Sequence, residues 1–345
     1  MELVAFQQVK YDKRDHTMKT PDPKRPDDFI SISGSKMRAL ARQGATPCAV
    51  PMPSDVVAAN CVPPGFMVPT GWSIVVDYYQ NADTKRWVPW SRPLVDPSLA
   101  PGVTAEGQYG TNDFTVYFKK DGRTISPWHD LPLRPAGASG SGSVVGSADG
   151  FYTGVIEIPM HTTAKLEVQK ALPNNPIKQD THDDGSARYY LYGNPPFNYG
   201  LLPQTWEDPN WLSDGYRADN DPLDIIELGS GPLPVGSVLR VKVLGALKLI
   251  DGGEADTKIL VIREEEAGSV KDLQALERVR PGSITRLVDW LKNYKLPDGK
   301  PSNPLVSEIP SSPADAAAII GECHVRWQML RNGTTTAGAE GFYIG

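Results

Sequence analysis

Three carboxylates lie within six residues at Asp219, Asp221 and Asp224. The first two are two residues apart, so an extended chain points them to one face, and Pro222 fixes φ so that the third can converge on the same space. Crowded acids raise one another's pKa unless cations neutralise them. No Lys or Arg lies inside the run, and only Arg217 is close. Hard oxygen ligands without an internal counter-charge predict a Mg²⁺ or Mn²⁺ site. The alternative is a solvated acidic turn, because acids with shifted pKa values also occur in structural networks.

Further acidic, basic and aromatic motifs accompany this run in a fixed order along the chain. They occupy residues 155–159 (VIEIP), 164–168 (AKLEV), 175–180 (NPIKQD), 198–200 (NYG), 203–209 (PQTWEDP), 251–258 (DGGEADTK) and 294–301 (YKLPDGKP). Together they resemble the soluble family I inorganic pyrophosphatases, from near Phe114 to about Trp327. The segments at 203–209 and 294–301 are similar to those of the eukaryotic branch.

The resemblance implies Mg²⁺-dependent hydrolysis of inorganic diphosphate (pyrophosphate) to two phosphates. This reaction needs neutralised phosphate charge, a strong nucleophile and a stabilised leaving group, and bound ions can supply all three. The number of acids implies several Mg²⁺ ions, with Mn²⁺ or Zn²⁺ as substitutes and Ca²⁺ as an inhibitor. The implied metal ligands are Asp219, Asp224 and Asp256 for the first ion pair, Asp251 for ions that arrive with substrate, and Glu167 and Glu157 mainly through water.

The same resemblance assigns the other site residues. Asp221 matches the general base, with a further metal ligand as the alternative, since geometry must decide a base assignment. Lys165 and Glu167 alternate on one strand and share a face. The implied phosphate clamps are Arg188, Lys258 and Lys295, and the implied phenol donors are Tyr199 and Tyr294. Arg suits a bidentate grip on phosphate, whereas Lys acts as a movable point charge.

Two positions depart from the family pattern. The family places a second tyrosine, which bonds the base, where this chain has Pro195. Either Tyr192 replaces it or the base lacks that partner. The acidic loop reads Asp251-Gly252-Gly253 where a second outer carboxylate is common.

Two other functions stay open at this point. One is a hydrolase of longer polyphosphates or nucleotides, although no base-stacking pocket is evident. The other is a non-catalytic scaffold with a pyrophosphatase-like fold. Nearly all the charged motif positions are retained, which argues against the scaffold.

The composition of the chain limits its possible binding partners and its location in the cell. The 345 residues carry a net charge of −6, which argues against nucleic-acid binding. No run of eighteen apolar residues occurs, so we expect no membrane span. Three cysteines without a C-x-x-C motif fit a reducing compartment. We expect a homo-oligomer in the cytoplasm, with an acidic polyphosphate-storing organelle (the acidocalcisome) as the second location.

The elements needed to position these residues are mostly strands. Alternating patterns predict strands at 152–158, 164–169, 187–192, 222–228, 237–248 and 256–262, and apolar periodicity predicts helices at 270–278, 282–294 and 312–329. We therefore expect an α+β, mainly β fold, which the resemblance specifies as a five-stranded OB-like β-barrel flanked by helices.

Two domains are expected, an N-terminal extension at 1–105 and the catalytic domain at 106–345. Within the extension, 1–50 reads as a polar arm with little core, and 63–101 as a small ordered segment. Residues 77–83 resemble a calcium loop only in part, and a helix end with a turn is the better interpretation. Residues 134–150 read as a flexible low-complexity insertion.

Overall fold

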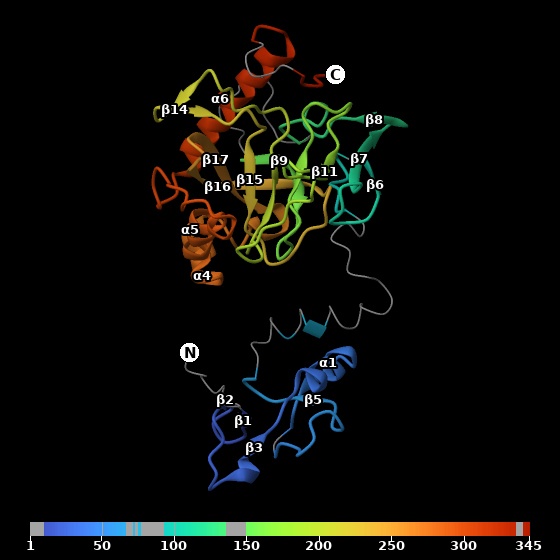
Figure 1. Ribbon diagram of the computed structural model, residues 1–345, viewed down its shortest axis with the longest axis vertical. Helices are drawn as coiled ribbons and strands as arrows, with labels where there is room; N and C mark the ends of the chain where they lie inside the picture. The colour runs from blue at the N-terminus through green and yellow to red at the C-terminus, as the bar shows by residue number, and fades with distance from the viewer. Residues whose placement is uncertain are drawn as a thin grey trace. The chain divides into compact units, whose positions relative to one another are not determined.

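A computed structural model describes residues 10–49, 51–66, 72, 75–76, 93–99, 101–135, 150–335 and 341–345. The chain forms two compact units, Met1–Val88 and Pro89–Gly345 (Figure 1). The segment at 77–83, much of the expected segment 63–101 and most of the expected insertion at 134–150 lie outside the described residues.

The first unit has a small core of its own. Its elements are β1 (Lys10–Asp12), β2 (Thr17–Lys19), a 3₁₀ turn (Pro26–Asp28), β3 (Phe29–Ile30), α1 (Gly34–Arg42), β4 (Thr46–Pro47) and β5 (Cys61–Val62). Ser33 caps α1 by accepting from the Lys36 amide. Leu40 is buried with Ile30 and Val56. The expected polar arm with little core differs from the structure at residues 10–49, where α1 buries one apolar face in this small core.

The first unit also contains a disulfide bond. Cys48, the residue after β4, is bonded to Cys61 of β5, and both are buried. The cysteine count alone favoured a reducing compartment. A disulfide removes that support, because disulfides persist mainly in oxidising compartments.

The second unit is built from strands with a few helices. Its strands are β6 (Gly102–Glu106), β7 (Thr115–Lys120), β8 (Arg123–Ile125), β9 (Phe151–Ile158), β10 (Leu166–Val168), β11 (Ile177–Gln179), β12 (Asn198–Leu201), β13 (Leu212–Ser213), β14 (Tyr216–Ala218), β15 (Asp224–Glu227), β16 (Val238–Asp251) and β17 (Glu254–Arg263). Its helices are α3 (Glu264–Ala267), α4 (Leu273–Val279), α5 (Ser283–Asn293), a 3₁₀ turn (Leu296–Asp298) and α6 (Pro313–Arg331).

Five of these strands pair in a closed ring. The order is β17, β15, β12, β9 and β16, and β16 pairs again with β17. Only β15 and β17 run parallel, and the other ring pairs are antiparallel. A β-carbon on Gly200 would lie 1.9 Å from the Val155 carbonyl, so only glycine fits where β12 crosses β9. The ring corresponds to the five-stranded core that the family resemblance implied.

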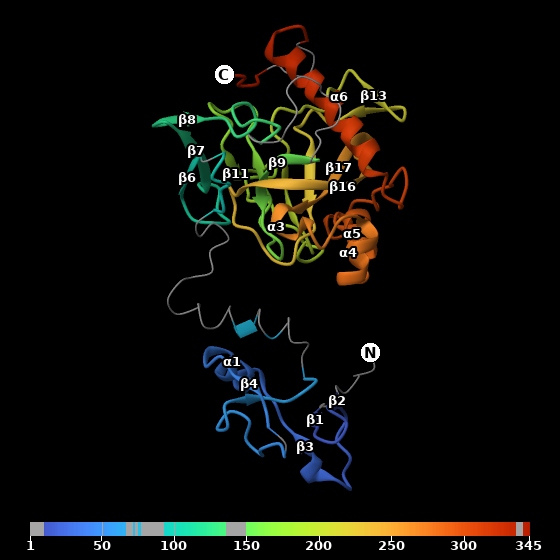
Figure 2. The same cartoon turned by 180° about the vertical axis from the view of Figure 1, so that it is seen from behind.

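Helices cover the outside of the ring (Figure 2). Ala316, Ile320 and Cys323 of α6 pack with buried residues of β16, including Leu239 and Val241. A capping box at Ser312 starts α6. In a separate cluster, α4 and α5 bury Leu276, Leu287 and Leu291 with other residues of β16 and β17. The second cluster includes Leu249, two residues before Asp251, so α4 and α5 pack near the end of β16 that carries this acid.

Most predicted elements of this unit are present, with one error. No strand forms at 187–192, where the backbone makes only single bridges, Thr181 with Ala187 and Ala164 with Tyr189. Gly193 and the Pro195-Pro196 pair interrupt the segment before β12. The boundary expected between residues 105 and 106 would cut β6, which pairs with β7 in the second unit.

No helix among the described residues is long and apolar enough to cross a membrane.

Candidate active site

A cavity of about 440 Å³ opens at the end of the ring. It gathers side chains from segments that are far apart in the sequence. Its charged and phenolic lining residues are Glu157, Lys165, Glu167, Lys170, Tyr190, Tyr199, Asp219, Asp221, Asp224, Asp251, Glu254, Asp256, Lys258, Tyr294 and Lys295. Twelve of the thirteen predicted site residues are therefore in this lining, and Arg188 is not.

The acidic run is held in place by backbone contacts between two loops. The Asn220 amide donates to the Glu207 carbonyl at 3.0 Å, and the Glu207 amide donates to the Asp221 carbonyl at 2.9 Å. Asn220 has a left-handed φ of 70°, which asparagine tolerates better than most residues. The Asp219 side chain accepts from the Asp221 amide at 3.0 Å. These bonds turn Asp219 and Glu207 toward the same space.

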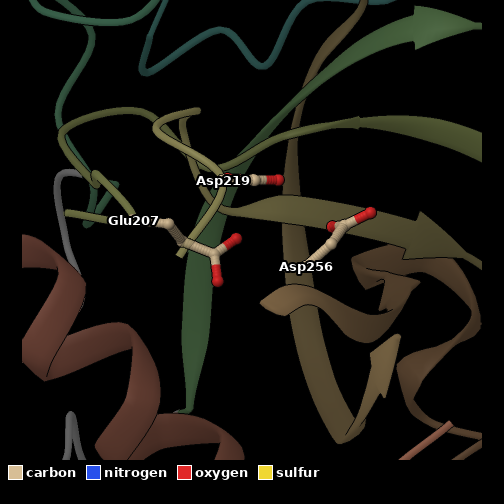
Figure 3. A group of neighbouring side chains, drawn as sticks. All are labelled: Glu207, Asp219 and Asp256. Atoms are coloured by element: carbon tan, nitrogen blue, oxygen red, sulfur yellow. The ribbon is translucent and has the colours of Figure 1, made fainter. Parts of the chain in front are cut away.

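Three carboxylates meet there, Glu207, Asp219 and Asp256 (Figure 3). One oxygen of each lies within 4.8 Å of the others. Burial raises the pKa of Asp219 and of Glu207 well above their usual values, and the neighbouring carboxylates raise both further. Such values arise where like charges lack a counter-charge.

Beside this cluster, Lys258 is buried between two acids. Its Nζ lies 2.5 Å from Asp224 Oδ2 and 2.6 Å from Asp256 Oδ1, and it donates to the Tyr199 hydroxyl at 2.6 Å. Tyr199 in turn donates to Asp224. Burial opposes the charge of Lys258, but the two carboxylates raise its pKa well above the usual value. Burial raises the pKa of Asp224 to about 7, although Lys258 acts in the opposite direction.

The β9–β10 side of the cavity combines acids with a lysine. Glu157 is buried, its Oε1 accepts from the Val168 amide at 2.6 Å, and burial followed by Asp224 raises its pKa well above the usual value. Lys165 donates to Glu167 at 2.6 Å.

Arg188 reaches this group only indirectly. Its Nη1 donates to Asp180 Oδ2 at 2.7 Å, and the same oxygen accepts from Lys165 Nζ at 2.7 Å. Asp180 thus links Arg188 to Lys165 of the cavity lining, although Arg188 itself is not a lining residue.

The opposite rim is formed after α5. Lys295 pairs with Asp251, and the Tyr294 hydroxyl donates to Asp251 Oδ2 at 2.9 Å. Burial would raise the pKa of Asp251, but Lys295 and Tyr294 lower it below the usual range. Burial raises the pKa of Tyr294 well above its usual value, so this phenol stays a hydrogen-bond donor at neutral pH.

Tyr192 does not replace the tyrosine missing at Pro195. Its hydroxyl donates to Asp289 at 3.1 Å, away from the cavity lining. Tyr190 lines the cavity instead, and burial raises its pKa to about 12. Its ring packs edge-on to Tyr294 at 5.8 Å.

Sequence reasoning missed four lining or cluster residues. They are Lys170, Tyr190, Glu207 and Glu254. Glu207 and Glu254 lay inside quoted motifs, so motif membership was an available signal. Lys170 forms an ion pair with Asp221, and nothing local in the sequence points to that contact.

The residues present fit divalent cations. The donors are carboxylate oxygens, which Mg²⁺ prefers. Asp256 Oδ1 is buried, and the charged group beside it is Lys258 Nζ at 2.6 Å. A cation beside Asp256, Asp219 and Glu207 would relieve the repulsion that raises the pKa values of the last two.

Comparison with known proteins agrees with this geometry. A profile described as inorganic pyrophosphatase matches residues 154–328. The chain therefore belongs to the inorganic pyrophosphatase family. It is a hydrolase that cleaves inorganic diphosphate, as its motifs predicted.

Relatives and solved structures are similar over about two-thirds of the chain. Soluble inorganic pyrophosphatase 6, chloroplastic, of Arabidopsis thaliana is 39% identical over 248 residues, which cover 70% of this chain and 78% of the relative. The type I inorganic pyrophosphatase of Toxoplasma gondii is 39% identical with a TM-score of 0.62, over 67% of this chain and 100% of that one. The N-terminally truncated vacuolar soluble pyrophosphatase of Trypanosoma cruzi, in complex with PPi, is 33% identical with a TM-score of 0.62, over 70% and 96%.

Proposed function

We propose that the cavity binds diphosphate together with several Mg²⁺ ions and that Asp221 is the general base for the attacking water. The observation that carries this proposal is the convergence of seven acids and three lysines, all predicted or motif residues, on one 440 Å³ cavity. They are Glu157, Glu167, Asp219, Asp221, Asp224, Asp251, Asp256, Lys165, Lys258 and Lys295.

Asp219, Asp224 and Asp256 would hold the first ions, with Glu207 as an added acid of the same group. Asp251 would hold ions that arrive with substrate, and Glu157 and Glu167 would act mainly through water. Bound Mg²⁺ would neutralise phosphate charge and acidify the attacking water. Mn²⁺ or Zn²⁺ would substitute, and Ca²⁺ would inhibit.

The chain's own residues have separate tasks in this scheme. Asp221 takes a proton from the attacking water. Lys165, Lys258, Lys295 and Arg188 neutralise phosphate oxygens, Arg188 after its bond to Asp180 is exchanged for substrate. The phenols of Tyr199 and Tyr294 stay protonated, because burial raises the pKa of each, and so donate to phosphate oxygens.

Asp221→Asn tests the base assignment. We expect phosphate release from diphosphate to fall by about 10²–10⁴-fold in kcat, the usual contribution of a general base, with unchanged circular dichroism. The matched control is Asp121→Asn at an exposed turn of left-handed φ, which asparagine also accepts. Wild-type kcat in Asp221→Asn would refute the base.

A substrate panel separates the related activities. Diphosphate, tripolyphosphate, a longer polyphosphate and ATP are compared by kcat/KM with Mg²⁺, with Mn²⁺, with Zn²⁺ and with added Ca²⁺. We expect the highest kcat/KM for diphosphate with Mg²⁺. A higher kcat/KM for every longer chain or nucleotide would favour the alternative hydrolase. Full cellular function of Asp221→Asn would favour the scaffold.

We also propose a homo-oligomer, with the catalytic part at 106–345 and the extension at 1–105. The cavity lining lies between Glu157 and Lys295, which supports placing the catalytic part at 106–345. Because β6 pairs with β7, residues 102–105 would also belong to the catalytic part structurally. Sedimentation of the purified chain tests the oligomer. A monomer at micromolar concentration would contradict it.

For location we propose the cytoplasm, with the acidocalcisome second. The similar Trypanosoma cruzi protein is named vacuolar, and the similar Arabidopsis protein chloroplastic. The Cys48–Cys61 disulfide supports an organelle. Imaging of the tagged chain in its own cell would decide between the two.

A further inference from the structure

Lys170 connects the turn after β10 to the acidic run. Its ammonium pairs with Asp221 Oδ1 and also donates to the Asn220 carbonyl at 2.9 Å. The Asp221 side chain is 47% exposed, so few other contacts restrict it. Lysine has four rotatable side-chain bonds, and holding it in one conformation costs entropy unless neighbours restrict it.

The C-terminal segment (residues 341–345) supplies that restriction. The Tyr343 amide donates to the Lys170 carbonyl at 2.8 Å. The Phe342 ring centre lies 5.3 Å from Lys170 Nζ, within the range at which a cation is attracted to an aromatic face. Both the backbone and the ammonium of Lys170 are therefore held by this segment.

The C-terminal segment is itself anchored in the core. Asn175 is fully buried, and its Nδ2 lies 3.1 Å from the Tyr343 carbonyl and 2.9 Å from the Lys170 carbonyl. Phe342 packs edge-on against the buried Trp128 at 5.6 Å. Asn175 thus joins the segment and the Lys170 turn through one amide group.

We infer that Lys170 is a positioning residue that holds Asp221 in place, and that Phe342 and Tyr343 hold Lys170. The inference rests on the proposed role of Asp221 as general base. A base must lie within hydrogen-bond reach of the proton that it takes, so freedom of its side chain lowers the rate. Although Lys170 lines the cavity, the role inferred for it acts through Asp221, so its loss affects turnover rather than substrate binding.

The test uses single and double variants of the full chain, assayed with diphosphate and Mg²⁺. Lys170→Gln lowers kcat about 10–100-fold, the usual effect of removing a partner that orients a site residue, with unchanged KM and unchanged Mg²⁺ affinity by calorimetry. Lys170→Arg restores most of kcat, because it keeps the charge. Phe342→Ala lowers kcat about two- to fivefold, the strength of one exposed cation–aromatic contact.

The double variant decides whether the segment acts through Lys170. Phe342→Ala in the Lys170→Gln background has no further effect on kcat if the inference holds, and an additive loss overturns it. Ile344→Ala is the packing control, since Ile344 packs on the same core without a ring; its kcat stays at the wild-type value. A loss in Ile344→Ala equal to that in Phe342→Ala also overturns the role of the ring.

Asp221→Asn is measured in parallel to separate two failures. Wild-type kcat in Asp221→Asn means that the proposed base is wrong. An inactive Asp221→Asn together with wild-type kcat in Lys170→Gln means that the base stands and the positioning role of Lys170 is wrong. Thermal melts of each variant show whether a loss comes from unfolding.

Discussion

Replacing Glu207 by glutamine should change stability in opposite directions with and without Mg²⁺. Glu207 is 5% exposed and lies within 4.8 Å of Asp219 and Asp256. At 4.8 Å and an effective dielectric of about 20, each ionised pair repels by about 3.5 kcal/mol. Glutamine has nearly the same shape and can still accept from the Thr257 amide, which Glu207 Oε2 meets at 3.4 Å.

Without metal, the substitution removes repulsion. Because the pKa values of Glu207 and Asp219 are raised, each acid keeps its proton to a higher pH than an ordinary carboxyl, and the repulsion grows as the pH rises. We expect the free energy of unfolding of the metal-free protein to rise by about 1–3 kcal/mol. With Mg²⁺, the same change removes an attraction, and we expect the affinity to fall about 10–100-fold.

The assay is thermal unfolding with chelator and with Mg²⁺, beside calorimetric titration. A hundredfold weaker ion at fixed concentration removes about 2.7 kcal/mol of ligand stabilisation, or roughly 5–10 °C in Tm for a unit of this size. The control is Glu265→Gln at an exposed position of α3, which should change neither value. A metal-free Glu207→Gln protein that is less stable, with unchanged Mg²⁺ affinity, would show that Glu207 serves only as a structural acceptor.

Two further outcomes can be measured. Burial raises the pKa of Asp224 from its ordinary value of 3.8 to about 7, so its protonated form stabilises the fold at low pH and this stability is lost as pH rises through 7. The loss amounts to about 1.4 kcal/mol for each pH unit between the two pKa values, so the metal-free protein should lose up to about 3 kcal/mol of unfolding free energy in urea between pH 5 and 8. Mg²⁺ at pH 8 should restore it, and a flat profile would contradict a raised pKa at Asp224. Cys48→Ser opens a disulfide with a sequence separation of 13 and should destabilise the first unit by about 2–4 kcal/mol. Faster proteolysis of that unit with unchanged phosphate release is the expected result, and wild-type proteolysis would refute it.

Several strands of the ring and the helices outside it follow from local patterns in the sequence, whereas the five-stranded ring itself was implied by the family resemblance. Long, largely apolar runs at β16 and β17 and the apolar periodicity of α5 specify their elements without tertiary information. The same holds for the acidic run, whose residues at Asp219 and Asp224 line one cavity. Short-range spacing was sufficient there because the three acids lie within six residues.

Other contacts depend on pairings between distant segments. Glu207 reaches Asp219 through two backbone bonds between loops, and no residue spacing encodes them. Lys170 reaches Asp221 from a turn about fifty residues earlier. The segment at 187–192 has strand-like side chains, but the glycine and prolines after it prevent a continuous ladder. Contacts of this kind can be identified only once the folded backbone is known.

The closed order of β9, β12, β15, β16 and β17 has a consequence for refolding. The acids sit on strands and loops whose partners are far apart along the chain, as where Val155 pairs with Val238. Chain closure over such separations is slow and comes after local hairpins. Uptake of a divalent ion during renaturation would therefore report the final nonlocal pairing, rather than the early collapse of the polypeptide.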